Sequence, residues 1–363
     1  MKRYYMEQKK KILLHDQQYT IGGPKAVLDG IEKSYLGEKY EFVRITQTTA
    51  CGFNPIKAWN EIKQCKKQID EQHADCIYIC GFEYPGFLMT IASKLSNVKR
   101  LVLSCHGSAW DTPDGTLRKF ILKYIIETIQ VYLADSIITV CNAAQRSVGA
   151  IRIACHGNNG GVVYNTFPNR DFAEYDTTEL RKELGIADDK IVVTSVGRVV
   201  EPKGHAYTIQ AIKELNDPKY VFVVVGDGPY LDEYRKQCAQ EIEEGKVILL
   251  GQRGDVFRIL RNSDIYLFST LNENHSIALL EAVNMKCCAL CTNVGGNPEI
   301  IENGVSGIVI PRKDSHAIVE GLKKLADKEV RKQYAERAYD ICIDKFSIEN
   351  TYGKLEKVLL GEK

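Results

Sequence analysis

The sequence predicts an α/β fold in which two doubly wound, Rossmann-like domains follow each other along the chain. Short β-rich runs alternate with helical stretches, which is typical of parallel sheets with helices on both faces. This alternation occurs twice, once in each half of the chain. With 363 residues and 44% hydrophobic content, the chain can bury two cores.

Each half contains six strand-like runs. In the front half, strands are expected at Lys11–His15, Tyr40–Thr46, Cys76–Cys80, Arg100–Cys105, Ser136–Val140 and Gly161–Tyr164. In the rear half, they are expected at Ile191–Val196, Tyr220–Val225, Val247–Leu250, Ile265–Phe268, Cys288–Thr292 and Gly307–Ile310. Ligands of such sheets bind beyond the carboxyl ends of the strands, so the loops there carry the candidate site.

The domain boundary is expected near Asn165–Asp171, where the sequence breaks regular structure before a charged helix over Thr177–Gly185. Helical sequence then runs from Asp327 to Leu360, with an interruption at Phe346 and Ser347. We therefore expect a first domain over residues 1–168, a second over 169–345 and a C-terminal helix over 346–363.

Charge is distributed unevenly. Residues 1–170 hold 22 Lys and Arg against 15 Asp and Glu, whereas the remainder holds 26 against 32, for a total of only +1. A basic front half indicates an anionic partner, and a membrane surface, a lipid diphosphate and nucleic acid all qualify. No motif of basic and aromatic residues supports nucleic acid, so we expect none to bind.

Twelve cysteines are scattered through apolar runs, and no secretory signal precedes them. We expect reduced, mostly buried thiols in a cytoplasmic protein. Cys288 and Cys291 form a C-x-x-C inside an expected strand, where core packing is favoured over metal or redox chemistry. No apolar run reaches the length of a membrane-spanning helix.

The segment from Asn272 to Glu299 carries the strongest functional signal. It sets Glu273 and Glu281 eight residues apart across a loop-to-helix junction, with Glu281 about two turns inside the helix. Both carboxylates would then face one ligand at the helix N-terminus, where backbone N–H groups and the helix dipole favour a phosphate. The spacing alone is equally consistent with two solvated carboxylates.

The surrounding residues decide between these interpretations. E-x7-E followed by V-G-G-N-P-E resembles the C-terminal signature of glycosyltransferase family 4, a retaining family with the GT-B fold. The resemblance implies two Rossmann-like domains facing a central cleft, with the C-terminal helix crossing back to the first domain. It also implies a nucleotide-sugar site in which Glu273 orients the sugar and Glu281 the ribose.

One departure from the family pattern follows Glu273. Many members have Gly-Phe-Gly there, and this chain has Asn274-His275-Ser276. The backbone N–H groups of Ser276 and Ile277 are still expected to bind the phosphate and sugar, but the sugar's identity is left open.

A second motif runs from Gly197 to Gly204 and resembles the family's G-R-x-x-x-x-K-G. Arg198 and Lys203 lie on one loop that follows a strand, and two cations there suit a departing diphosphate. A guanidinium can donate two parallel hydrogen bonds to a phosphate, and an ammonium group acts as a compact positive charge. Two solvated loop cations are the alternative. The family resemblance also places the nucleobase near Arg253, and a plain surface loop is an equal alternative there.

In the front half, Gly22-Gly23-Pro24 resembles the family's glycine loop near the diphosphate and acceptor, with an ordinary turn as the alternative. His106 ends an expected strand and resembles the histidine that contacts the donor sugar. A structural histidine is the alternative. The apolar stretch Leu117–Leu133, with Arg118, Lys119 and Lys123 at its front, is interpreted as a helix packed under the sheet rather than on an anionic bilayer.

We therefore expect a retaining, metal-independent glycosyltransferase that uses a nucleotide sugar, with UDP as the expected nucleotide, and no other cofactor. The expected acceptor is a glycan or lipid-linked acceptor of cell-surface polysaccharide biosynthesis. The expected location is cytoplasmic, with peripheral contact at the inner membrane face through the basic front half left open. A non-catalytic subunit partnering another transferase, or an epimerase or phosphorylase of the same fold, remains the alternative.

Overall fold

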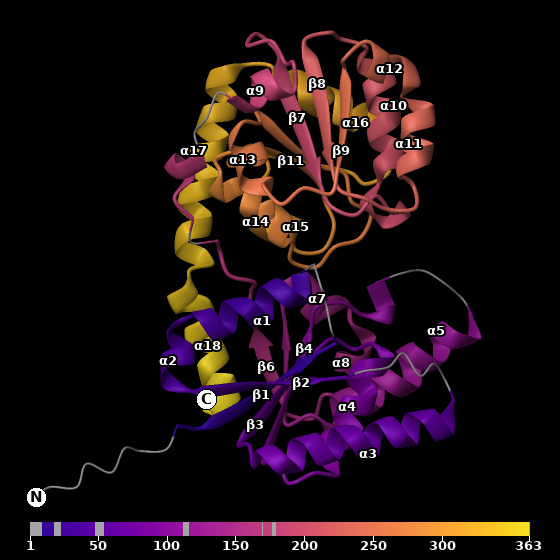
Figure 1. Cartoon of the computed structure of the whole chain (residues 1–363), viewed down its shortest axis with the longest axis vertical. Helices are drawn as coiled ribbons and strands as arrows, with labels where there is room; N and C mark the ends of the chain where they lie inside the picture. Colours follow the sequence, from indigo (N-terminus) through magenta and orange to yellow (C-terminus); the bar gives the residue numbers. More distant parts are fainter. Residues whose placement is uncertain are drawn as a thin grey trace, which may run out of the picture. The chain divides into compact units, whose positions relative to one another are not determined.

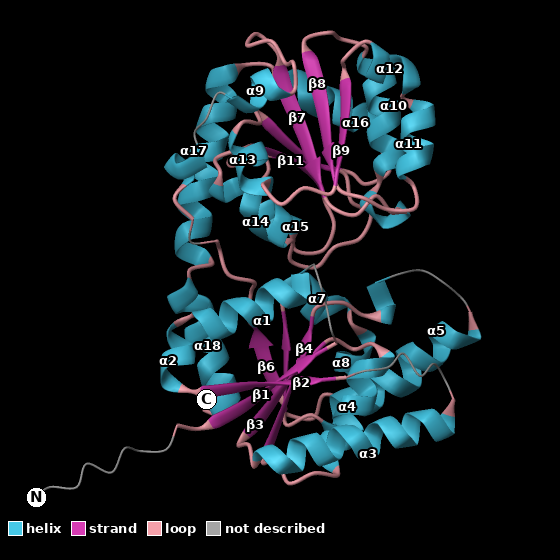
Figure 2. Ribbon diagram, viewed as in Figure 1, coloured by secondary structure: helices cyan, strands magenta, loops and turns pink. Residues whose placement is uncertain are grey.

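The computed structural model describes residues 9–17, 23–47, 54–111, 116–168, 170–175 and 179–362. The chain divides into two compact units, one formed by Met1–Thr166 with Ile348–Lys363 and the other by Phe167–Ser347. Each unit has a six-stranded sheet with helices against it (Figure 1, Figure 2). Every described strand pair is parallel, as the alternating sequence pattern predicts.

The first unit has strand order β2-β1-β3-β4-β5-β6. Its strands are β1 (Lys11–Asp16), β2 (Glu41–Thr46), β3 (Cys76–Cys80), β4 (Arg100–Cys105), β5 (Ser136–Thr139) and β6 (Asn159–Val162). Its helices are α1 (Gly23–Lys33), α2 (Tyr35–Lys39), α3 (Pro55–Gln72), α4 (Tyr84–Lys94), η1 (Ala109–Asp111), α5 (Leu117–Ile121), η2 (Leu122–Ile126), α6 (Glu127–Leu133), α7 (Asn142–Ser147), α8 (Gly149–Ala154) and α18 (Ile348–Leu360).

Both faces of the first sheet are apolar. Leu13 packs with α3, α4 and α6 on one face, whereas its neighbours Ile12 and Leu14 pack with α1 and α18 on the other. This alternation follows from the two-residue period of a strand. Helix α18 lies beside α1 (Figure 1), and Tyr352 reaches Gly30, where an added Cβ would lie 2.5 Å from the Tyr352 hydroxyl. The expected return of the last helix to the first domain is confirmed.

The second unit has strand order β12-β11-β10-β7-β8-β9. Its strands are β7 (Ile191–Val196), β8 (Tyr220–Val225), β9 (Val247–Gly251), β10 (Ile265–Phe268), β11 (Cys288–Thr292) and β12 (Ile308–Ile310). Its helices are η3 (Phe172–Tyr175), α9 (Glu179–Glu183), η4 (Glu201–Lys203), α10 (His205–Leu215), α11 (Leu231–Gln237), α12 (Ala239–Glu243), α13 (Val256–Arg261), α14 (Ile277–Asn284), α15 (Asn297–Ile300), α16 (Ser315–Lys324) and α17 (Lys328–Lys345).

One expectation about local structure was wrong, and a second held only in part. Strand β6 covers Asn159–Val162 rather than 161–164, because Gly160 fits closely against Ile138 and the ladder shifts register between Ile137 and Thr139. Residues 117–133 do not simply pack under the sheet. They form a continuous helical run, α5-η2-α6, that buries Ile126 and Val131 but leaves large apolar side chains exposed.

The expectation for cysteine is confirmed where the structure describes it. The described cysteines are free, and all but Cys155 are buried, including Cys288 and Cys291 on β11. Within the described ranges, no helix is both long and apolar enough to cross a bilayer.

Three aspartates immediately before strands hold the amino ends of the sheets. Asp75 accepts from the Lys11 N–H at 3.1 Å and Asp135 from the Leu101 N–H at 2.7 Å. In the second unit, Asp264 accepts from the Val192 N–H at 2.9 Å. In each case the aspartate N–H donates back to the carbonyl of the same partner residue. A reciprocal bond of this kind fixes the register of a parallel pair before the first ladder bond.

Asp264 also binds two guanidinium groups. Arg181 lies at 2.9 Å and Arg331 at 3.2 Å, and their side chains are only 19% and 9% exposed. Removing this carboxylate would leave two partly buried cations without their negatively charged partner and one N–H without its acceptor, which is costly in a low-dielectric setting.

We therefore predict that Asp264→Ala destabilises the protein by roughly 2–4 kcal/mol, measured by urea denaturation. Asp232→Ala is the matched control, because Asp232 pairs with Arg235 but is 84% exposed, and it should leave the midpoint unchanged. Equal midpoints for Asp264→Ala and the wild-type protein would contradict the structural role of this carboxylate.

Candidate functional site

The loops at the carboxyl edge of the second sheet contact one another through backbone. Gly226 has a φ of +142°, and a Cβ there would lie 1.9 Å from the Gly197 carbonyl oxygen. A Cβ on Gly228 would lie 2.4 Å from the Val199 carbonyl oxygen. Only glycine allows this approach, so the turn after β8 holds the Arg198 loop in place.

The same loop is bound to the segment after β10 on its other side. Pro202 accepts from the Leu271 N–H at 2.7 Å, and the Ser269 hydroxyl donates to the Lys203 carbonyl at 3.2 Å. Gly204 has a φ of +70°, and its Cβ would lie 2.0 Å from the Ser269 carbonyl oxygen. The turn that carries Lys203 therefore has a fixed position relative to the loop that carries Glu273.

Lys203 and Glu273 form an ion pair. The Lys203 Nζ lies 2.7 Å from Glu273 Oε2, and both side chains are about a quarter exposed, at 25% and 22%. The ammonium group also lies 5.2 Å from the centroid of the Phe268 ring. The structure thus brings together two residues that the sequence assigned to one site from motifs 70 positions apart.

The turn after β11 supports the backbone of Glu273. Gly295 has a φ of +51°, and a Cβ there would lie 1.6 Å from the Glu273 carbonyl oxygen. The next N–H, that of Gly296, donates to the Asn274 carbonyl at 2.6 Å. The two glycines of the V-G-G-N-P-E motif therefore fix the loop that precedes α14.

Helix α14 begins directly after this loop. Ser276 is its N-cap, and the Ser276 hydroxyl accepts from the Leu279 N–H at 3.2 Å. The first N–H groups of a helix have no intrahelical acceptor, which makes this end suited to an anion. His275 turns inward, 3% exposed, and packs edge-on against Phe346 with ring centroids 4.8 Å apart. The side chain that replaces the family's Phe is therefore part of the core.

Glu281 lies on α14 beyond this end. It is the fifth residue of the helix and so lies little more than one turn inside it. The expected depth of two turns was wrong. Burial raises the pKa of its carboxyl to about 7, although the positive charge of Arg170 acts in the opposite direction. Nothing in the sequence motifs pointed to Arg170, which lies in the irregular segment that opens the second unit.

The other two cations expected in this unit differ in their surroundings. Arg198 is exposed, and its carbonyl lies 3.4 Å from Nε2 of His205. Arg253 is held by carboxylates: its guanidinium donates twice to Asp255, at 2.8 Å each, and once to Glu183 at 3.2 Å. Arg253 thus belongs to an ion-pair cluster beside β9, and its side chain does not join the Lys203–Glu273 pair.

The front-half candidates lie in the first unit. Gly22 falls outside the described residues, and Gly23 is the exposed first residue of α1. His106 follows β4, with Nε2 at 3.0 Å from the Ser104 hydroxyl and 3.5 Å from that of Tyr78. Desolvation by burial lowers the pKa of His106 to about 4, so its imidazole is neutral near pH 7.

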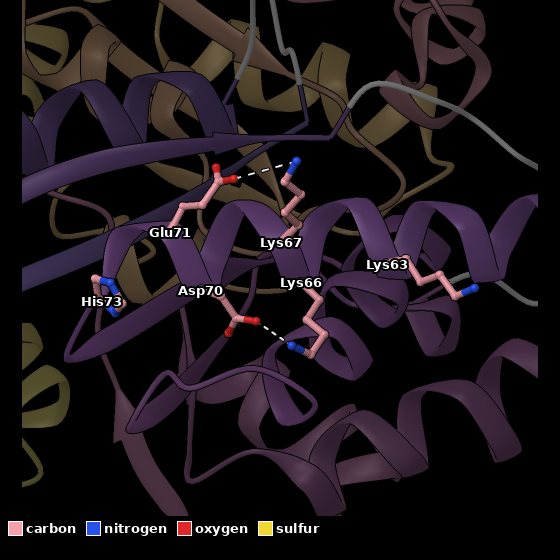
Figure 3. Close-up of a pocket in the computed structure, with 6 residues that line it drawn as sticks. All are labelled: Lys63, Lys66, Lys67, Asp70, Glu71 and His73. Carbon is pink, nitrogen blue, oxygen red and sulfur yellow. Dashed lines mark hydrogen bonds and ion pairs between the residues drawn. The ribbon is translucent and has the colours of Figure 1, made fainter.

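Two further features bear on the chemistry. In the part of the chain that the structure describes, no group of three His, Cys, Asp or Glu side chains is arranged to hold a metal ion. An open pocket on α3 is lined by Lys63, Lys66, Lys67, Asp70, Glu71 and His73 (Figure 3). Its Lys66–Asp70 and Lys67–Glu71 pairs neutralise each other along the helix, so we assign it no role.

Comparisons with known proteins agree with this architecture. The family model described as "Glycosyl transferases group 1" matches residues 176–341, and the one described as "Glycosyl transferase 4-like" matches residues 28–140. The UDP-Gal:alpha-D-GlcNAc-diphosphoundecaprenol alpha-1,3-galactosyltransferase of Escherichia coli is 24% identical over 76% of this chain and 72% of its own length. The capsular polysaccharide biosynthesis glycosyltransferase CapM of Staphylococcus aureus is 22% identical over 84% and 82%.

Solved structures show the same fold. Anabaena HepE in complex with UDP and glucose superposes with a TM-score of 0.78 and 20% identity, covering 97% of this chain and 100% of its own. Sucrose-phosphate synthase from Thermosynechococcus elongatus gives a TM-score of 0.78 and 14% identity, with the same coverage. The GT-B fold expected from the sequence is confirmed.

The raised pKa of Glu281 predicts a pH dependence of stability. Below the unfolded pKa the carboxyl is neutral in both states, whereas above about 7 the folded protein must hold a buried charge. The wild-type protein should therefore lose stability relative to Glu281→Gln as pH rises from about 4.5 to about 7. Melting temperatures of the two proteins across this range test the prediction.

Glu233→Gln, at an exposed position on α11, is the control and should follow the wild-type curve. A Glu281→Gln protein whose melting temperature stays parallel to that of the wild type at every pH would contradict a buried, titrating carboxyl.

Proposed function

The chain belongs to the glycosyl transferases group 1, and from this premise we propose that it transfers a sugar from UDP, with retention of anomeric configuration, to a glycan or lipid-linked acceptor. The setting we propose is cell-surface polysaccharide biosynthesis, in keeping with the CapM relative, whose name gives capsular polysaccharide biosynthesis. We assign the nucleotide sugar to the second unit and the acceptor to the first.

The Lys203–Glu273 pair at the start of α14 is the observation that carries this proposal. An ammonium group, an exposed guanidinium on the same loop and a helix N-terminus together suit a diphosphate. The carboxylate beside them suits the hydroxyl groups of a sugar, because an ionised carboxylate is a strong hydrogen-bond acceptor. A diphosphate joined to a sugar offers phosphate oxygens to Lys203 and hydroxyl groups to Glu273 at the same time.

In the proposed reaction, the bond between the anomeric carbon and the diphosphate oxygen breaks. A bond from the acceptor oxygen forms on the same face of the sugar, and the acceptor proton passes to the departing phosphate. Lys203 and Arg198 stabilise the negative charge that develops on the leaving group. No covalent nucleophile and no metal ion is required by this scheme.

The remaining residues have supporting roles in the proposal. Ser276 and Ile277 offer backbone N–H groups to the phosphate, and Glu281 accepts from the ribose hydroxyls. Neutral His106 hydrogen-bonds a sugar hydroxyl without adding a positive charge. Gly22 and Gly23 allow close approach to the diphosphate. We place the nucleobase near the loop that contains Arg253, with the guanidinium retained by Asp255 and Glu183.

The alternatives differ in what they require of this site. A non-catalytic subunit would have no use for the aligned Lys203–Glu273 pair, but it would need a stable partner transferase. An epimerase or phosphorylase of the same fold would retain the nucleotide or phosphate site. Product analysis separates these from transfer, because only a transferase forms a new glycoside together with free UDP.

We predict that UDP and a UDP-sugar stabilise the protein against heat, whereas GDP, ADP and CMP do so weakly, with or without Mg²⁺. A ligand at 100 times its Kd stabilises by about 2.7 kcal/mol. Lys203→Met should weaken UDP binding about tenfold or more, because it removes a charge-assisted contact. Differential scanning fluorimetry over a UDP titration measures both effects.

Lys213→Met is the matched control, because Lys213 is exposed on α10 outside the site, and it should bind UDP like the wild type. No stabilisation of the wild-type protein by any nucleotide would overturn the donor-site proposal.

For the location of the protein, we propose a cytoplasmic enzyme whose first unit contacts an anionic membrane through the run α5-η2-α6. This run exposes a row of large apolar side chains: Leu117 (74%), Phe120 (54%), Tyr124 (45%), Ile125 (47%), Ile129 (37%) and Tyr132 (63%). The π-helical turn η2 shifts the helix phase by about one residue, so the stripe over residues 117, 120 and 124 continues over 125, 129 and 132.

The charges at the start of this run favour an anionic lipid surface over a protein partner. Arg118 is exposed, and the next residue, Lys119, and Lys123 further along the same run are half-buried. Basic groups interleaved with aromatic and aliphatic side chains suit the headgroup region of an anionic bilayer. A lipid-linked acceptor would then be reached from the surface on which the enzyme lies.

We predict that the protein floats with vesicles of phosphatidylcholine and phosphatidylglycerol, less with phosphatidylcholine alone, and less at high salt. The double variant Leu117→Ser/Phe120→Ser should lower the partition coefficient about tenfold or more, since two apolar side chains leave the interface. Ile343→Ser, which removes a comparably exposed side chain from α17, should bind like the wild type. Equal binding of the double variant and wild type would contradict this surface.

A further inference from the structure

Glu127 is a buried carboxylate that none of the sequence motifs identified. It is the first residue of α6 and is 1% exposed. Glutamate is almost never buried to this extent unless its carboxylate is paired. Its hydrogen-bond partners therefore indicate what it does.

Both carboxylate oxygens bind the segment that follows His106. Oε1 accepts from the Ala109 N–H at 2.6 Å, and Oε2 accepts from the Ser108 hydroxyl at 2.7 Å. The Ser108 oxygen in turn accepts from the Trp110 N–H at 3.1 Å. One side chain thus fixes three consecutive residues that begin two positions after His106.

The helix contributes a second attachment through its π-helical turn. The Glu127 N–H donates to Leu122, five residues earlier, rather than to Lys123 as in an α-helix. The Lys123 carbonyl accepts instead from the indole Nε1 of Trp110 at 3.3 Å. The irregular turn and the buried carboxylate therefore hold the same loop.

Close packing around Trp110 completes the attachment. A Cβ on Gly149 would lie 2.5 Å from two atoms of the Trp110 ring, so this ring fills the space that glycine leaves. The Tyr124 ring lies edge-on with its centroid 4.9 Å away. Displacing the segment from Ser108 to Trp110 would break hydrogen bonds and ring contacts together.

We infer that Glu127 is a positioning residue that fixes the loop from His106 to Trp110, so that His106 meets the sugar in the geometry that transfer requires. This inference rests on the proposed function, because it takes sugar contact as the role of His106. Glu127 acts through this loop and has no contact with substrate in the inference.

The electrostatic setting gives the loop a pH dependence. Burial raises the pKa of Glu127 to about 7, with Asp111 acting in the same direction, whereas the bonds from Ala109 and Ser108 and the charge of Lys123 oppose it. Burial raises the pKa of the Cys105 thiol on β4, and the negative charge of Glu127 acts in the same direction. Ionised Glu127 offers two acceptors to two donors, whereas the protonated group carries a proton on one oxygen, so the hydrogen bonds to the loop change as pH passes through about 7.

Trp110 provides a readout that does not depend on activity. The chain has two tryptophans, and Trp59 is an exposed residue of α3. In the Trp59→Phe protein, the emission of Trp110 should change with a midpoint near pH 7. Glu127→Gln should abolish this step, because an amide can accept from Ala109 and donate to Ser108 without titrating.

Kinetics separate positioning from structure. Glu127→Ala should lower kcat/KM for transfer by about tenfold to a hundredfold, through the loss of two buried hydrogen bonds, while UDP still stabilises the protein as in the wild type. Glu127→Gln should restore most of the activity but lose the pH dependence near 7. Glu71→Gln, at an exposed position of α3, is the control and should change neither property.

The outcomes distinguish this inference from the function on which it rests. Wild-type protein that neither binds UDP nor transfers sugar overturns the proposed function. Wild-type protein that transfers sugar while Glu127→Ala matches it overturns the inference alone. If Glu127→Ala does not fold, an unchanged Trp110 titration and an unchanged pH profile in Glu127→Gln would overturn it instead.

Discussion

The register of the parallel strands is the constraint on which the rest of the structure depends. Asp75, Asp135 and Asp264 each close a reciprocal bond with the neighbouring strand at the amino end of a sheet. A shift of one residue would turn every side chain to the opposite face. Because all strands run the same way, fixing their amino ends also fixes where their carboxyl ends meet, and the functional loops leave from there.

At that edge, the second unit builds its site from backbone contacts that only glycine permits. Gly204 brings the turn of Lys203 against the Ser269 carbonyl, and Gly295 brings the turn after β11 against the Glu273 carbonyl. Both carbonyls belong to the loop between β10 and α14. The two charged side chains then meet at 2.7 Å. In the absence of ligand each neutralises the other, so little energy is stored in an unpaired charge. A sugar diphosphate, as proposed, would replace this internal pair with one partner for each charge.

Much of this arrangement was predictable from the sequence, because its signals are local. Each of the twelve strands in the described residues overlaps an expected one, since short β-rich runs between helical stretches leave little choice of structure. The motifs also identified Lys203 and Glu273 as site residues, but they did not predict that these two side chains form an ion pair. Glu127 and Arg170 carried no local signal: their roles come from burial and from neighbours distant in the chain. The same is true of β6, whose limits depend on how Gly160 fits against Ile138.

The run α5-η2-α6 shows why one irregular helix can serve two purposes. Its outer face exposes an apolar stripe, and its inner face carries Glu127 against the His106 loop. An ideal α-helix would rotate the second half of the stripe by about one residue and would direct the Glu127 N–H to the Lys123 carbonyl. The π-helical turn changes both at once: it keeps the stripe on one face and leaves that carbonyl to Trp110. The irregular turn therefore serves both faces at once, because it aligns the exposed stripe and adds one bond to a loop that the Glu127 side chain already holds.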